Sequence, residues 1–156
     1  MKKYPASFDL LTKCITVSFI IMTIICLFMK LYLVIIILIV TSVIAFLMSP
    51  DYYELSPTTL IIKKIFGEKI IRINSIKEII SVESQDLRFS IRLFGSGGFM
   101  GYFGKYSNFK FGMMNWYATQ RKNYLLITTM DNQRIVITPD SPQMLQDDIK
   151  NRQNSL

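Results

Sequence analysis

The stretch CITVSFIIMTIICLFMKLYLVIIILIVTSVIAFLM, residues 14–48, contains a single charged residue, Lys30. It is too long for one membrane-spanning helix, which needs about 20 apolar residues. One continuous helix would also place Lys30 near the middle of the hydrocarbon, at a cost of roughly 2.5–3.5 kcal/mol. Two helices joined by a turn at Lys30 place this cation at the interface instead. The sequence therefore predicts a transmembrane hairpin with spans over about 9–29 and 31–49.

The hairpin does not have the features of a cleaved leader. Its first apolar run ends in FMKL (28–31), without small residues at a cleavage site, and a second apolar run follows at once. Lys2 and Lys3 precede the first span, Lys13 lies at its start and further basic residues follow the second span, whereas the turn has only Lys30. By the positive-inside rule, we expect a multi-pass protein of the cell (inner) membrane with both termini in the cytoplasm.

The composition narrows the classes of site that the chain can hold. The net charge is +7, but outside the apolar stretch the charges are mixed, so we predict no nucleic-acid partner. The chain has no histidine, which removes the commonest general base and metal ligand. Cys14 and Cys26 both lie in the apolar stretch, about 18 Å apart along a helix, too far to bridge within it. The remainder of the chain therefore holds no disulfide and no thiolate metal site.

From residue 52 onward the sequence reads as short β-strands. The runs are rich in β-branched and aromatic residues: YYELS, TLIIKKIF, KIIRI, IKEIISVES, LRFSIRLF, NWYATQ, YLLITTM and RIVITP. Gly67-Glu68 and Asp131-Asn132 are expected hairpin turns. No helical pattern separates the runs, so residues 50–156 are predicted to form an all-β barrel or sandwich of about seven antiparallel strands.

The end of the chain has a helical pattern. In PDSPQMLQDDIKNR (139–152), Leu145 and Ile149 are four residues apart on one face, and Pro142 suits the first helical position. Asp140 or Ser141 is the expected N-cap. We predict one C-terminal α-helix that caps the β domain.

Many antiparallel strands followed by one helix resemble a pleckstrin-homology (PH)-like domain. The stretches YELSPTTLIIKKIFGEKIIRINSIKEI (53–79), LRFSIRLFGSGGFMGYFG (87–104) and YATQRKNYLLITTMDNQRIVITPDSP (117–142) are similar to bacterial PH-domain families found in small membrane-anchored proteins. The resemblance is carried by R-x-F-G-S-x-G (92–98), G-Y-F-G (101–104) and I-x-P-x-x-P (137–142). These motifs are structural, so the resemblance implies a fold and no reaction. It divides the chain into a tail and hairpin (1–49) and a PH-like domain (50–156).

The glycine-rich segment LFGSGGFMGYFGKY (93–106) is not a phosphate-binding loop. A Walker loop ending at Gly104-Lys105 would need glycine at Phe99 and a serine or threonine at Tyr106. The dinucleotide pattern fails at Met100, where its third glycine is required. We expect a long connection between strands, in which glycines permit positive φ.

Two interpretations of the aromatic residues in this connection stay open. Their rings fill a small barrel, or four of the residues form an adhesive tip that contacts the bilayer or a partner protein: Phe99, Met100, Tyr102 and Phe103. A second candidate contact, with anionic lipid, consists of Lys63, Lys64, Lys69 and Arg72 around the first hairpin. Phosphoinositide-binding PH domains place basic residues there. Each basic residue near an anionic membrane contributes about 1 kcal/mol to the attraction between protein and lipid. Alternation along the strand sends Lys63 and Lys64 to opposite faces.

No constellation of catalytic residues is evident. Ser96 lies outside a G-x-S-x-G elbow and there is no histidine to activate it. We predict no catalytic, cofactor-binding or metal-binding residues. The predicted function is a non-catalytic, membrane-anchored PH-like interaction or scaffolding module, with a membrane protein or a second copy of the chain as partner. The alternative is a lipid- or amphiphile-binding domain at the bilayer surface.

Overall fold

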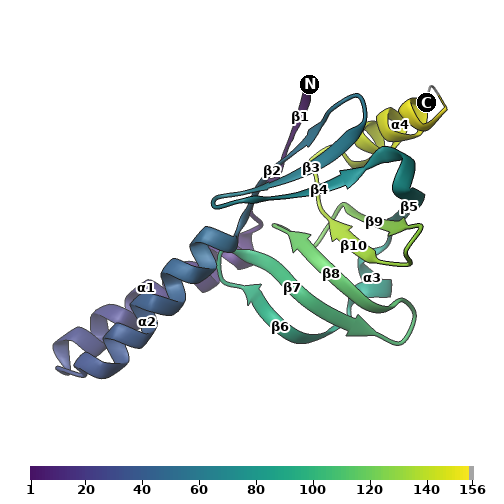
Figure 1. Cartoon of the computed structure of the whole chain (residues 1–156). Coiled ribbons are helices and arrows are strands. Elements are labelled where there is room, and N and C mark those ends of the chain that lie inside the picture. The colour runs from purple at the N-terminus through teal and green to yellow at the C-terminus, as the bar shows by residue number, and fades with distance from the viewer. Residues whose placement is uncertain (155–156) are drawn as a thin grey trace.

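The computed structural model describes residues 1–154 of the chain. Two long helices near the N-terminus are followed by strands and a C-terminal helix (Figure 1). In chain order the elements are β1 (Lys2–Pro5), α1 (Leu10–Phe28), α2 (Tyr32–Met48), β2 (Pro50–Leu55), β3 (Thr59–Lys64), β4 (Glu68–Arg72), a 3-10 turn (Ile73–Ser75), β5 (Ile76–Val82), α3 (Ser84–Leu87), β6 (Ile91–Gly98), β7 (Gly101–Asn108), β8 (Gly112–Ala118), β9 (Tyr124–Thr129), β10 (Arg134–Ile137) and α4 (Pro142–Gln153).

The two apolar helices lie side by side and project away from the sheets (Figure 1). Asp9 caps α1, since its side chain accepts a hydrogen bond from the Thr12 backbone N–H at 2.7 Å. Lys30, with φ +58°, lies in the turn between them, as predicted. Within the described chain, α1 is the one helix long and apolar enough to cross a membrane, and α2 is a shorter apolar helix.

The strands form two sheets. One has the order β1-β2-β3-β4 and the other β5-β9-β10-β8-β7-β6, and neighbours are antiparallel except for the parallel pair β8 and β10. Across the described residues, no strand pairing joins the two sheets. The expectation of about seven antiparallel strands is therefore wrong in number and in one pairing. The predicted runs correspond to β2–β6 and β8–β10, and the additional strands are β1 and β7.

Strand β1 comes from the predicted N-terminal tail. It pairs antiparallel with β2, with Tyr4 opposite Tyr53. Tyr4 is buried, and its hydroxyl donates to the Asp148 carboxylate on α4, which also accepts from Lys2 at 2.6 Å. These two donors, Lys2 first, lower the pKa of Asp148. The start of the chain is thus fixed to both the sheet edge and the last helix.

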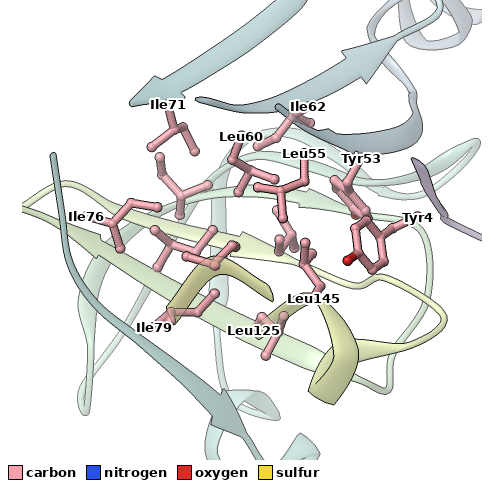
Figure 2. Close-up of a cluster of buried hydrophobic side chains, with 14 of the residues drawn as sticks. Tyr4, Tyr53, Leu55, Leu60, Ile62, Ile71, Ile76, Ile79, Leu125 and Leu145 are labelled. Atoms are coloured by element: carbon pink, nitrogen blue, oxygen red, sulfur yellow. The ribbon is translucent and has the colours of Figure 1, made fainter. Parts of the chain in front are cut away.

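The main core lies between the four-stranded sheet, one face of the six-stranded sheet and α4 (Figure 2). Leu145 and Ile149 of α4 are fully buried in it, which confirms the predicted helical face. Ser141 is the N-cap of α4. Buried members of the core include Tyr4, Tyr53, Leu55, Leu60, Ile62, Ile71, Ile76, Ile79, Leu125 and Ile127.

A second core covers the opposite face of the six-stranded sheet, beneath α3. Strand β9 shows the division, because Leu125 and Ile127 belong to the main core and Tyr124 and Leu126 to the second. A sheet buried on both faces gives a continuous apolar run in place of an alternating one. This second core carries the aromatic residues of the candidate site.

Tyr53 makes the stability of the fold sensitive to alkaline pH. Its buried hydroxyl donates to the Tyr117 carbonyl at 2.6 Å and accepts from the Thr138 N–H at 3.0 Å. Burial raises the pKa of Tyr53 to about 12, above the usual value of about 10. The folded state therefore holds this proton more tightly than the unfolded state does.

We expect the contribution of Tyr53 to stability to be complete below about pH 10 and lost as the pH rises towards 12. Tyr53→Phe should flatten the fall in the free energy of unfolding over this interval. The measurement is a series of urea transitions of the full chain in detergent at increasing pH, with Tyr52→Phe as the matched control. An unchanged slope in Tyr53→Phe would contradict the assignment.

Candidate functional site

The predicted glycine-rich connection is a β-hairpin. Strands β6 and β7 pair from Ile91 to Gly98 with one register shift between Arg92 and Phe94, and Phe99 and Met100 form the turn. Gly95 and Gly104 lie opposite each other, with φ +109° and +118°. A Cβ at Gly95 would lie 2.0 Å from the Phe103 carbonyl oxygen. The glycines are therefore required for the close approach of two backbones, and the expectation of a loop is corrected.

The turn of this hairpin contacts the helices of its own chain. The Phe99 ring packs on Phe19 of α1, with ring centroids 4.6 Å apart. The Met100 N–H donates to the Thr16 hydroxyl at 3.3 Å, and its carbonyl accepts from the Ser49 hydroxyl at 2.6 Å. Phe99 and Met100 are half-buried by these contacts.

The other two residues of the expected adhesive tip lie in β7. Tyr102 is 2% and Phe103 3% exposed. They are not available to a partner in this conformation, because both rings are packed inside the protein. The expectation of one exposed tip made of all four residues is therefore corrected.

Further polar contacts join α1 to the domain. The Asp9 carboxylate accepts from the Arg121 backbone N–H at 3.0 Å and from the Tyr102 hydroxyl at 3.4 Å. The Thr12 hydroxyl donates to the Thr119 carbonyl at 3.4 Å. The base of the helical hairpin is thus fixed to the six-stranded sheet at both the start and the first turn of α1.

Exposed apolar side chains surround this base. We call Ile65, Phe66 and Phe94 the apolar rim. The backbone N–H of Phe66 donates to the Leu47 carbonyl at 2.8 Å, which places the β3–β4 turn against the end of α2. Phe66 is 73% and Phe94 70% exposed. Phe94 also lines an apolar cavity of about 480 Å³ between the helices and the β6–β7 hairpin, with Phe19, Ile44, Met48, Phe99 and Phe103.

A second cavity, of about 470 Å³, lies between α3 and the second core. We call it the α3 cavity. Trp116 and Tyr106 stack in its wall with ring centroids 4.3 Å apart, and Arg88, Arg92 and Arg121 also line it. Burial raises the pKa of Tyr106 to about 12, although the charges of Arg92 and Arg121 act in the opposite direction. Its hydroxyl is therefore a neutral donor at ordinary pH, and it donates to the Ser96 carbonyl.

The comparison with known families matches this part of the chain. A family model described as a bacterial PH domain matches residues 51–153. The chain belongs to the bacterial PH-domain family. The match begins after α2 and ends with α4, so it confirms the resemblance drawn from the sequence motifs. No curated protein and no solved structure matches the chain.

Membership in this family indicates an interaction or binding module and gives no sign of catalysis. The α1–α2 hairpin and β1 lie outside the matched region. The contacts of Asp9, Thr12 and Thr16 therefore join α1, which lies outside the matched region, to the bacterial PH domain.

The basic residues predicted to contact lipid do not form one patch on the bacterial PH domain. In the β3–β4 ladder Lys63 lies opposite Glu68 and forms an ion pair with it. Alternation places Lys64 and Lys69 on the face of the buried Leu60 and Ile62. Lys63 and Arg72 project from the other face, so the four cations are divided between two surfaces.

The sequence reasoning missed the arginines of the α3 cavity as a group. They come from three separate segments: the residue after α3, strand β6, and the turn between β8 and β9. Only Arg92 stood in a recognised motif, where it had no assigned role. Arg88 and Arg92 are four residues apart but share no helix, and only a tertiary contact adds Arg121, so no spacing rule unites the three.

Proposed function

We propose that this chain is a non-catalytic, membrane-anchored interaction module, in which α1 and α2 cross the bilayer as a hairpin and hold the bacterial PH domain at the cytoplasmic face. The observation that carries the proposal is the outward-facing apolar surface of both helices. Thr12 is the one buried residue of α1, and α2 has none. Such a surface needs a lipid or protein covering, since soluble proteins rarely expose apolar patches of this extent.

The position of β1 supports two crossings. The chain enters α1 directly after β1 and leaves α2 directly before β2, and these two strands pair with each other. A single crossing would put the paired strands on opposite sides of the bilayer. At 1.5 Å per residue, α1 and α2 are about 29 and 26 Å long, close to the hydrocarbon thickness of about 30 Å.

The distribution of charge supports the orientation. Lys2, Lys3 and Lys13 lie at the domain end of the helices, and Lys30 alone lies at the far turn. Lysines near the ends of spans are retained on the cytoplasmic side. The apolar rim surrounds the same end, where aromatic side chains are commonly found at the membrane interface. The bacterial PH domain is therefore proposed to rest against the cytoplasmic surface.

A second candidate function is the binding of a lipid or amphiphile. It is favoured by the apolar cavity between the helices and the β6–β7 hairpin, whose lining includes Ile44 and Met48 from α2. Under the proposed anchoring this cavity opens at the level of the bilayer surface, where an acyl chain is within reach. The interaction module, with a membrane protein or a second copy of the chain as partner, remains the main proposal.

The anchoring is tested by fractionation and topology reporters. We expect the full chain to stay in the membrane pellet after carbonate washing. A C-terminal alkaline phosphatase fusion should be inactive, because phosphatase folds only outside the cytoplasm. The same reporter inserted at Lys30 is the matched control and should be active, since the turn lies on the opposite side. Carbonate release would refute the anchor, and an active C-terminal reporter would refute the orientation.

A further inference from the structure

Three cations converge on the α3 cavity without a carboxylate among its lining residues. Arg88, Arg92 and Arg121 all line it, and none takes part in the ion pairs found among residues 1–154. Asp9 accepts from the backbone N–H of Arg121 and from the Tyr102 hydroxyl, and Asp86 of α3 is paired with Lys110. Because three guanidinium groups line the cavity and no carboxylate does, its lining has a net positive charge.

Two of the arginines lie against the β6–β7 hairpin. A Cβ at Gly97 would lie 2.8 Å from Nη1 of Arg92, so this glycine leaves the space in which the Arg92 side chain extends along β6. The Arg121 guanidinium lies over the Tyr102 ring, 5.0 Å from its centroid. A guanidinium group suits a phosphate especially well, because its planar fork can donate two parallel hydrogen bonds.

Two buried donors in the same cavity have no hydrogen-bond partner among the described residues. They are Nε1 of Trp116, a residue only 4% exposed, and the hydroxyl of Ser90. Leaving a buried donor unpaired is unfavourable. Because both residues line the cavity, an anion held by the arginines would bring acceptor oxygens to the wall that contains these donors. The stacked rings of Trp116 and Tyr106 offer an apolar surface to the group that carries the anion.

The α3 cavity adjoins the first turns of α1. Tyr102 and Arg121 line the cavity and also bind Asp9, the N-cap of α1. At Gly98, next to the lining residue Gly97, a Cβ would lie 2.5 Å from Cδ1 of Ile15 in α1. If α1 crosses the bilayer, the cavity therefore lies near the level of the phospholipid headgroups.

We propose that the α3 cavity binds a phosphate ester, and that its source is the headgroup of an anionic phospholipid in the leaflet that α1 enters. The choice of a lipid source rests on the proposed membrane anchoring, whereas the choice of a phosphate ester rests on the cavity alone. This site is separate from the β3–β4 hairpin, where the sequence predicted lipid contacts. Arg88 and Arg92 bind the phosphate, and Arg121 completes the positive wall.

The chain contains its own reporter, because Trp116 is the only tryptophan. The full chain is reconstituted in phosphatidylcholine nanodiscs, with or without phosphatidylglycerol, and its tryptophan emission is recorded. In a second arm, glycerol 3-phosphate is added to the protein in phosphatidylcholine nanodiscs. Phosphorus NMR of the same titration detects binding independently of the fluorescence. We expect a saturable change with both probes.

Arg88→Gln combined with Arg92→Gln should weaken the apparent affinity by about tenfold or more, because two charge-assisted contacts are lost. Both side chains are exposed, so the fold should persist, which unchanged emission without ligand would verify. Lys105→Gln is the control: Lys105 is also exposed and lies opposite Phe94 on the other face of the hairpin. It should change the affinity by less than about twofold, since it removes charge outside the cavity.

The outcomes separate the two proposals. Binding of phosphatidylglycerol, alone or with glycerol 3-phosphate, supports the lipid source. Binding of glycerol 3-phosphate alone keeps the phosphate-ester site and overturns the lipid source. No response to either probe in fluorescence and NMR overturns the proposal, as does an equal loss of affinity in Lys105→Gln and the double variant. Carbonate release of a protein that still binds glycerol 3-phosphate would refute the anchor and leave the site standing.

Discussion

Gly95→Ala is expected to destabilise the protein by roughly 2–5 kcal/mol, the combined cost of a strained positive φ and of overpacking. Gly95 has φ +109°, and a Cβ there would lie 2.0 Å from the Phe103 carbonyl oxygen and 2.8 Å from the Cα of Gly104. Both neighbours are backbone atoms of the paired strand, so neither can move without separating β6 from β7. The damage extends to the helices and the α3 cavity, because this hairpin carries Phe99 and Arg92.

The measurement is a urea transition of the full chain in detergent, followed by Trp116 emission. Gly67→Ala is the matched control. Gly67 also has positive φ, +80°, but a Cβ there would meet nothing closer than the end of the Lys64 side chain at 3.9 Å. Gly67→Ala should lower the free energy of unfolding only by the backbone strain, about 1–2 kcal/mol. An equal loss in the free energy of unfolding in Gly95→Ala and Gly67→Ala would show that the contact across the hairpin has no role in stability.

Tyr4→Ala is expected to cost about 3–5 kcal/mol, as for other large buried aromatic residues. Tyr4 is 2% exposed and lies beside Tyr53 in the main core (Figure 2). The substitution leaves a cavity between β1 and α4 and removes a hydrogen bond to Asp148. We therefore expect β1 to detach from the sheet edge.

Protease susceptibility at the N-terminus and the same urea transition measure this loss. Lys3→Ala, on the exposed side of β1, is the control and should fall within about 0.5 kcal/mol of the wild type. Tyr4→Phe separates the hydrogen bond from the packing, and should cost about 1.5–3 kcal/mol because the acceptor is a carboxylate. If Tyr4→Ala is as stable as Lys3→Ala, β1 is not a structural part of the domain.

The elements that the sequence predicted are those with a long or regular apolar pattern. The split at Lys30 predicted two helices, and the pair Leu145 and Ile149 predicted the buried face of α4. Short β-branched runs located the predicted strands. In each of these cases, the apolar pattern that marks the element is visible in neighbouring residues of the sequence.

The strands that were missed lack such a pattern. In β1 the run KKYP has one buried residue, Tyr4, so no alternation can be seen. Strand β7 is interrupted by glycines, which usually mark connections, but here they allow two backbones to approach. The parallel pairing of β10 with β8 follows from the insertion of β10 between β9 and β8, which adjacent turn signals do not specify.

The candidate site was predicted only in part. Phe99 and Met100 do lie in a turn, but the turn contacts the chain's own helices. The basic residues of β3 and β4 are close in the sequence, but the structure divides them between two faces of the sheet, so they do not form one patch. In the α3 cavity, Arg88 and Arg92 are four residues apart, but Arg121 joins them only after β7 and β8 have folded between them.

The pairing of β1 with β2 has a consequence for how the protein is made. The ribosome synthesises β1 before the helices and β2 after them, so the first strand has no partner until the whole hairpin has emerged. Under the proposed topology, both ends of the hairpin stay on the same side of the bilayer, so the two strands can pair once β2 has been synthesised. Once formed, the β1–β2 pairing joins the two ends of the helical hairpin, and neither helix can leave the bilayer alone without first opening this sheet.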